Sequence, residues 1–278
     1  MRRSNGVERR SSPTRGSPIR AERQPYTETV TLTEVLPFLA GIAVLVVLTV
    51  TILRIAEVGL GWLPVVAIVR AVVQLALVAL LLSGALTAWW AVAAFIGLML
   101  TTASLTSLRR SREVPRGPLG AVVGVIVGTL VTLGLVLALG LVDLQFERVI
   151  AIAGIVSGNA MTAATLAMRR YDGELRGGWG EVEAWLAVGA QPRRATKRLR
   201  QIAVREALLP NLDQTKNTGL VTLPGAFVGA LFGGASPLEA AQFQIVVLAS
   251  LMLAGALTAV IATQIASGTA LKPVDPAG

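Results

Sequence analysis

Residues 149–168 read VIAIAGIVSGNAMTAATLAM, and the 48 residues that follow, 169–216, are polar and contain EVEAWLAVGA at 181–190. An apolar run of this length can cross a hydrocarbon core about 30 Å thick as a helix. The polar segment is too hydrophilic for that core, so we expect it to lie outside the bilayer. The sequence therefore predicts a membrane protein that holds a short amphipathic helix, 181–190, outside the membrane between two spans.

The composition of the whole chain is that of a membrane protein. Hydrophobic residues make up 54% of the 278 residues, more than a soluble domain carries. The chain has no Cys and no His, which excludes disulfides and thiolate metal sites and removes the commonest transition-metal ligand. The net charge of +9 lies mostly in loops between spans, where it meets anionic membrane lipid rather than nucleic acid.

The predicted fold class is all-α, a polytopic membrane protein with about seven transmembrane helices and a cytoplasmic coupling helix. The seven apolar stretches are 35–53, 62–82, 88–106, 119–141, 149–168, 217–234 and 241–266. The loops 54–61, 107–118 and 169–216 and the C-terminal tail then share one side and carry 16 Lys and Arg. Because basic loops stay in the cytoplasm, we expect a plasma-membrane protein with its N-terminus outside and its C-terminus cytoplasmic.

Three regions follow from this pattern. Residues 1–34 form a basic tail with seven Arg before Pro25, which we expect to be disordered. No apolar stretch follows the Arg pairs of this tail, so we do not expect a signal peptide. Residues 35–266 form the transmembrane domain, with 169–216 as its cytoplasmic coupling loop. Residues 267–278 form a C-terminal tail.

The stretch 217–234, NTGLVTLPGAFVGALFGG, is the least regular of the predicted spans. Pro224 and Gly225 stand in its middle, and Pro removes a helical hydrogen bond. A kinked crossing and a re-entrant hairpin both fit this pattern, and we favour the kinked crossing.

Two glycine ladders have a spacing of four residues, which places each on one helix face and lets another backbone approach closely. Static packing is the favoured interpretation for both, and a dimer interface or an opening pathway is the alternative for the second. The ladders are Gly120, Gly124 and Gly128, and Gly225, Gly229 and Gly233.

Polar residues inside the spans are candidates for a transport pathway. Arg70 and Gln74 lie one turn apart in the middle of the second span, where a charge is costly and should face a partner or a water-filled cavity. A structural ion pair or a hydrogen bond to a helix end is the alternative. Asn159 in the fifth span is expected to bond a neighbouring helix or to line the pathway. The full set of pathway candidates is Arg70, Gln74, Asn159, Met161, Lys216, Pro224 and Gly225.

Enzyme signatures are missing from the sequence. No Gly is followed by Lys, so there is no phosphate-binding loop of the G-x-x-x-x-G-K-[ST] kind. Without His there is no catalytic triad, and no carboxylate cluster lies in the spans. We therefore expect no catalysis by this chain and no cofactor.

Three stretches together resemble one family: IVSGNAMTAATLAM (155–168), EVEAWLAVGAQPRRA (181–195) and LLPNLDQTKNTGLVTLPGAFVGALFGGASPLEAAQFQIVV (208–247). They resemble the FetB-type permeases, bacterial membrane subunits of an ABC transporter implicated in iron export, with plant relatives tied to aluminium tolerance. The resemblance covers about 155–266, and Arg70 and Gln74 match the family's R-A-x-x-Q pattern. It implies a separate ATPase subunit and a permease homodimer.

The resemblance also implies where the ATPase couples. The E-A-A-x-x-x-G helix of ABC permeases carries over as Glu183, Ala184 and Gly189, with Trp185 in place of the second Ala and Glu181 at the acidic start of the helix. The expected function is thus an ABC permease that exports iron, another metal or a small solute. A stand-alone secondary transporter or channel is the alternative.

Overall fold

The computed structural model describes residues 32–85 and 88–269, and nearly all of their regular structure is helical. The chain divides into two units, Met1–Val78 and Ala79–Gly278. Of the basic tail predicted over 1–34, all but the last three residues lie outside the described residues, as do residues 270–278 of the predicted C-terminal tail. The predicted all-α, polytopic fold class is confirmed.

The first unit contains α1 (Leu32–Ile55) and the beginning of α2 (Leu63–Ala85). Both helices are long and apolar enough to cross a membrane, as predicted for 35–53 and 62–82. In the turn between them, the guanidinium carbon of Arg54 lies 5.2 Å from the ring centroid of Trp62. This cation–π contact joins the two sides of the turn.

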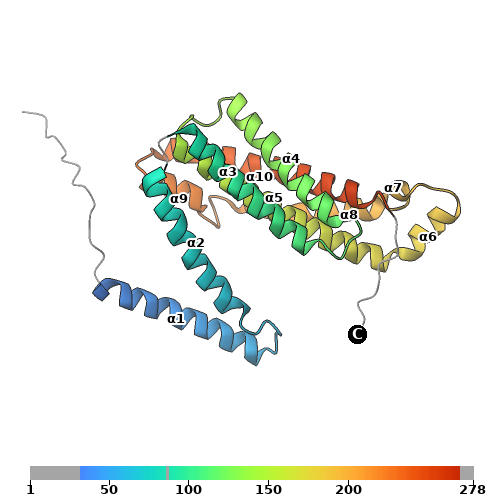
Figure 1. The fold of residues 1–278 in the computed structure, drawn as a ribbon, viewed down its shortest axis with the longest axis horizontal. Coiled ribbons are helices and arrows are strands. Elements are labelled where there is room, and N and C mark those ends of the chain that lie inside the picture. The colour runs from blue at the N-terminus through green and yellow to red at the C-terminus, as the bar shows by residue number, and fades with distance from the viewer. Residues whose placement is uncertain (1–31, 86–87, 270–278) are drawn as a thin grey trace, which may run out of the picture. The chain divides into compact units, whose positions relative to one another are not determined.

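The second unit is a helical bundle (Figure 1). Five helices pack against one another along much of their length. Two short helices lie at one end of the bundle and a third lies at the other. The bundle helices are α3 (Trp89–Arg110), α4 (Gly117–Ala138), α5 (Phe146–Gly177), α8 (Lys197–Asn217) and α10 (Pro237–Ala266); the short ones are α6 (Trp179–Ala187) and α7 (Pro192–Ala195), then α9 (Gly225–Phe232).

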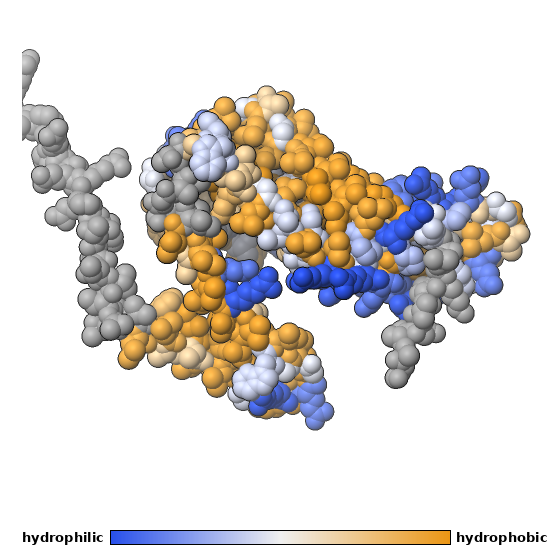
Figure 2. Space-filling view, in the orientation of Figure 1, coloured by the Kyte–Doolittle hydropathy of each residue, from blue (hydrophilic) through white to orange (hydrophobic). Residues whose placement is uncertain are grey.

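Two of the bundle's apolar clusters lie towards opposite ends. Tyr171, Leu175, Val182 and Leu199 belong to the cluster at the end that carries α6 and α7. Ile152, with Leu133, Val136 and other residues, belongs to the second cluster. Figure 2 shows an apolar surface along the bundle, with hydrophilic residues gathered mainly at the α6–α7 end. This distribution suits a bundle whose sides face lipid and whose α6–α7 end faces water.

The first glycine ladder packs α4 tightly against α10. A Cβ on Gly120 would lie 2.5 Å from the carbonyl oxygen of Ala262, and one on Gly124 would lie 2.8 Å from that of Thr258. The Thr258 hydroxyl donates a hydrogen bond of 3.0 Å to the Gly124 carbonyl. Close backbone approach through small residues is how membrane helices associate without a hydrophobic driving force. The packing interpretation of this ladder is therefore confirmed.

The prediction of one kinked helix over 217–234 is wrong. Residues 218–224 are not helical, Gly219 has φ +89°, and α9 that follows has only eight residues. In the described part of the chain six helices are long and apolar enough to span a membrane: α1, α2, α3, α4, α5 and α10. Hydropathy alone sums apolar residues and does not register the backbone break before Pro224.

The predicted loop 169–216 is also revised by the structure. α5 continues to Gly177, and α8 runs back along α5 and α10. Leu199, Ala203 and Ala207 form its buried face. The return from the α6–α7 end to the α9 end is thus made by α8, the break at 218–224 and α9 together. The C-terminal ends of α3 and α10 lie near α6 and α7. This agrees with the prediction that the segments after these two helices share one side with 169–216.

Candidate functional site

The short helix predicted over 181–190 is present as α6, Trp179–Ala187. Its inner side is anchored by Val182, which is fully buried, and by Leu186, which packs against the same cluster. Its outer side exposes Glu183, Ala184 and Trp185. Val188, directly after the helix, is 77% exposed. The arrangement presents a small apolar and acidic surface at the polar end of the bundle.

Gly189 ends α6 by its backbone conformation. It has φ +84°, a left-handed geometry that an L side chain would strain. The Gly189 amide donates to the Leu186 carbonyl and the Ala190 amide donates to the Trp185 carbonyl, both at 2.9 Å. This pair of bonds is a Schellman motif, which satisfies carbonyls at the helix end. Gly189 therefore fixes where α6 stops and the chain turns towards α7.

A salt bridge joins α6 to the beginning of α8. The Nε of Arg198 lies 2.9 Å from Oε2 and 3.1 Å from Oε1 of Glu181, so the carboxylate is held by a guanidinium from another helix. The hydrogen bond from Arg198 lowers the pKa of Glu181 below its ordinary value. Glu181, predicted to contact an ATPase, is thus bound within the chain, where it holds α6 to the beginning of α8.

A buried polar cluster links α7 and α8 to α5. Tyr171 on α5 is 1% exposed and shares a hydrogen bond with Thr196, the residue between α7 and α8. Arg200 on α8 is 9% exposed, and its Nη2 donates to the Arg193 carbonyl at 2.9 Å. Burial lowers the pKa of Arg200. None of these side chains was predicted from the sequence, because Arg200 counted only as a basic residue that sets membrane orientation and Tyr171 and Thr196 belong to no motif.

A second polar junction joins three helices inside the bundle. Asn159 on α5 donates its Nδ2 to the carbonyl of Leu251 on α10 at 2.8 Å. Asn211 on α8 donates to the same carbonyl at 3.4 Å. Gly255 makes room for both amides, since a Cβ there would lie 2.9 Å from the Nδ2 of Asn211. The predicted bond of Asn159 to a neighbouring helix is present. Asn211 was missed, although it continues the four-residue spacing of Leu199, Ala203 and Ala207.

The remaining pathway candidates of the second unit lie in different surroundings. Met161 packs against the apolar cluster at the α6–α7 end. Lys216 is exposed at the end of α8, Pro224 is the N-cap of α9, and Gly225 is its first residue. These last three lie around the break between α8 and α9, at least five residues beyond Asn211. A role for them in a pathway stays a prediction.

Arg70 and Gln74 belong to the first unit. They share one face of α2 with Val66, Val69 and Val73, as their spacing predicts, and both are exposed. Their predicted role in transport stays a prediction. Within residues 32–85 and 88–269, no group of three or more His, Cys, Asp or Glu is placed to hold a metal ion.

Comparison with known proteins identifies relatives over most of the chain. The model of the family described as "Uncharacterised protein family (UPF0014)" matches residues 37–270. The chain is 40% identical over 200 residues to UPF0014 membrane protein STAR2 of Oryza sativa subsp. japonica, which covers 71% of this chain and 70% of STAR2. It is 40% identical over 169 residues to Protein ALUMINUM SENSITIVE 3 of Arabidopsis thaliana, covering 61% of each chain.

A bacterial relative has a name that describes transport. The chain is 31% identical over 160 residues to the "Probable iron export permease protein FetB" of Escherichia coli K12, covering 58% of this chain and 62% of FetB. No solved structure matches the chain. The family match over 37–270 and the similarity to STAR2 show that this chain belongs to the UPF0014 family of multi-pass membrane proteins, as the resemblance to FetB-type permeases led us to expect.

Proposed function

We propose that this chain is the membrane permease subunit of an ABC transporter, acts as a homodimer, and uses a separate ATPase subunit to export iron, another metal or a small solute. The plasma membrane would hold it with the N-terminus outside and the α6–α7 end in the cytoplasm, because that end carries most of the basic loops. The observation that supports the proposal best is α6 itself, a short helix held outside the membrane-spanning helices.

The surface of α6 has the character of a protein interface. Trp185 is 45% exposed and Val188 is 77% exposed at an end of the bundle that is otherwise polar. Lipid would cover such side chains along the sides of the bundle, but not at the α6–α7 end, which faces water. Exposed apolar groups rimmed by charge mark protein contacts, and Trp is enriched among residues that dominate binding energy. Glu183 lies beside them and adds a charge that a basic groove on a soluble subunit could recognise.

The contacts behind α6 offer a route from such an interface into the bundle. Arg198 ties α6 to α8, and the cluster of Tyr171, Thr196 and Arg200 ties the start of α8 to α5. α8 then continues as one helix to Asn211, which meets α5 and α10 at the Leu251 carbonyl. A displacement of α6 by a motor subunit would therefore move α8 against α5 and α10.

Several facts support export of a metal or small solute, and none selects one substrate. FetB is named as a probable iron export permease, and the name of ALUMINUM SENSITIVE 3 refers to a metal. The chain itself has no His and no Cys, so it has no imidazole or thiolate ligand that could replace the ligands of an iron complex. A metal carried as a complex is consistent with both observations.

Co-purification tests the proposal. The chain is expressed with its candidate ATPase subunit, extracted in mild detergent, and the recovered ATPase is quantified. Val188→Asp and Glu183→Lys should remove most of the ATPase without lowering the amount of membrane-inserted chain. Glu113→Lys is the matched control, since Glu113 is an exposed acidic residue at the same end of the bundle but outside α6. ATPase recovery that is equal in all three variants would contradict docking at α6.

A further inference from the structure

We propose that the groove between α3 and α4 binds an anionic phospholipid, with an acyl chain along the groove and the phosphate at Arg109 and Arg112. The proposal concerns the second unit alone and does not depend on an ATPase partner. Three observations carry it: the shape and apolarity of the groove, one buried hydroxyl without a partner, and the unpaired basic side chains at one end.

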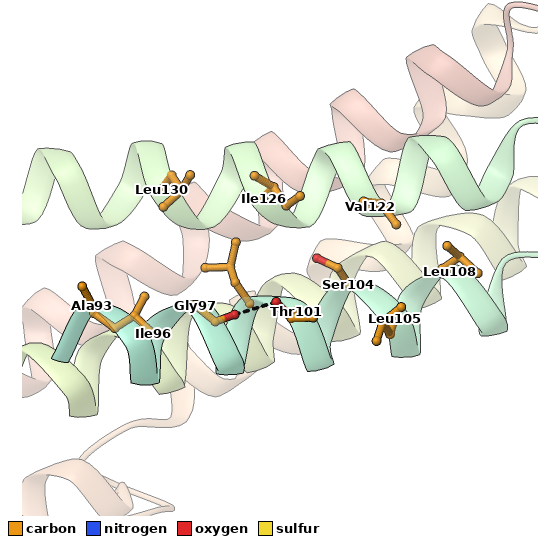
Figure 3. Close-up of a pocket in the computed structure, with 11 residues that line it drawn as sticks. Ala93, Ile96, Gly97, Thr101, Ser104, Leu105, Leu108, Val122, Ile126 and Leu130 are labelled. Carbon is orange, nitrogen blue, oxygen red and sulfur yellow. Dashed lines mark hydrogen bonds between the residues drawn. The ribbon is translucent and has the colours of Figure 1, made fainter. Parts of the chain in front are cut away.

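The groove is formed by facing sides of two membrane helices. Figure 3 shows Val122, Ile126 and Leu130 of α4 pointing towards α3, which contributes Ile96 and Leu100 among others. Its volume is about 690 Å³, within the range of about 300–1,000 Å³ that holds one small ligand. From Ala93 to Leu108 it follows 15 residues of α3, or about 22 Å at 1.5 Å per residue. The groove is thus long, narrow and apolar, which suits an extended hydrocarbon chain.

Other occupants match the groove less well. An ordered water needs two to four polar partners, whereas the walls offer only two hydroxyls, one of them already bonded within its own helix. An apolar helix packed on the groove would leave the Ser104 hydroxyl and the charges of Arg109 and Arg112 without the ester and phosphate acceptors that a phospholipid supplies.

Two hydroxyls line the groove, and only one of them has a partner. Thr101 donates to the Gly97 carbonyl of its own helix at 2.7 Å. Ser104 is 7% exposed, and its Oγ has no hydrogen-bond partner among the described residues. Figure 3 shows the Ser104 hydroxyl directed into the space between α3 and α4. A buried donor left unsatisfied is costly, and an ester carbonyl of a lipid would accept its hydrogen bond.

Basic side chains continue the groove at its Leu108 end. Arg109 follows Leu105 by four residues and therefore continues the same face of α3, and Arg112 lies in the turn directly after the helix. The side chains of both are exposed, and neither has an ion pair or hydrogen bond within the described residues. Glu113 is the one acidic residue of this loop. Ser104 lies five residues, about 7.5 Å, before Arg109 along α3. The ester of a phospholipid would therefore lie at Ser104 and its phosphate at Arg109, in the order in which these groups follow the acyl chain.

Arg116 does not belong to this site. Its Nη1 would lie 3.0 Å from a Cβ on Gly268, so it sits over the C-terminal end of α10, where a cation is favourable. Basic pockets between membrane helices are known sites for anionic lipid head groups, and this one is placed at the end of an apolar groove.

Native mass spectrometry of the purified full chain tests the proposal. The chain is titrated with phosphatidylglycerol or with phosphatidylcholine of the same acyl chains, and bound lipids are counted. We expect one phosphatidylglycerol to be retained with a preference of about tenfold or more over phosphatidylcholine, since each basic residue favours anionic lipid. Arg109→Gln/Arg112→Gln should abolish that preference. Arg194→Gln/Lys197→Gln, which removes the same charge from exposed residues at the same end, should retain it.

A second variant tests the groove itself. A Cβ on Gly97 would meet nothing within 4 Å, so Gly97→Phe can fill the groove without disturbing the helix, and it should lower occupancy by both lipids. Equal lipid binding by the Arg109→Gln/Arg112→Gln variant and its control would overturn the head-group site. Because the chain has no Cys, a Cys at position 97 can be cross-linked specifically. Efficient cross-linking from it to α1 or α2 in anionic membranes would show that a helix of the chain, rather than lipid, fills the groove.

Discussion

Replacing Gly124 by Ala tests whether the α4–α10 contact holds the bundle together. A Cβ at position 124 would lie 2.8 Å from the Thr258 carbonyl oxygen, a backbone atom that cannot rotate away. The helices must separate, and the hydrogen bond from the Thr258 hydroxyl to the Gly124 carbonyl is then strained. Overpacking typically costs about 1–3 kcal/mol, and a membrane hydrogen bond contributes about 0.6 kcal/mol.

Gly134→Ala is the matched control, because Gly134 lies on the same helix and a Cβ there would meet nothing within 4 Å. Both substitutions gain the same helix propensity, so the difference between them isolates the contact. We expect Gly124→Ala to be less stable than Gly134→Ala by about 1.6–3.6 kcal/mol, or about 15- to 400-fold in the opening equilibrium.

The assay uses a buried thiol in a chain that has no native Cys. Ser107 is fully buried, so Ser107→Cys reacts with a thiol reagent only when the bundle opens. Labelling rates of the two glycine variants in this background give the difference in opening free energy. If the Gly124→Ala variant labels no faster than the Gly134→Ala variant, the close contact does not stabilise the bundle and the argument fails.

Three further predictions concern the polar sites. Asn159→Leu should destabilise the bundle more than Asn211→Leu in the same labelling assay, because its hydrogen bond to the Leu251 carbonyl is 2.8 Å rather than 3.4 Å; the reverse order would refute this ranking. Because Arg198 lowers the pKa of Glu181, the tether of α6 persists above the ordinary carboxyl pKa of about 4.3 and is lost as the pH falls through the lowered value. A spin label on Val188→Cys should therefore keep its mobility from pH 8 to 5 and gain mobility only in stronger acid. A rise in mobility that begins above pH 5 would contradict this prediction. Arg70→Leu should insert normally but transport poorly. Normal transport by this variant would show that Arg70 contributes only to packing.

Most of the membrane helices could be predicted from the sequence because their signal is local. Stretches of apolar residues of bilayer length became α1 to α5 and α10, and the spacing of Gly120, Gly124 and Gly128 correctly indicated close packing. Both signals depend only on residue type and helical period, which tertiary contacts do not alter.

The segment from α8 to α9 could not be read in the same way. Its charges made α8 look like a loop, although Leu199, Ala203 and Ala207 at a spacing of four are the buried face of a helix. Conversely, the apolar content of 217–234 suggested a span, whereas Gly219 and Pro224 break the backbone. The convergence of Asn159 and Asn211 on one carbonyl depends on how three helices pack, and no local pattern contains that information.

Site-specific cross-linking to the ATPase subunit tests the central proposal most directly. In the Cys-free chain, single Cys residues are placed at Val188 beside α6 and at Leu139, which is 67% exposed at the opposite end of α4. A bifunctional reagent is then applied to membranes that contain both subunits. Docking at α6 predicts a cross-link to the ATPase from position 188 and none from position 139. A cross-link from position 139, or none from position 188 while the two subunits co-purify, would contradict it.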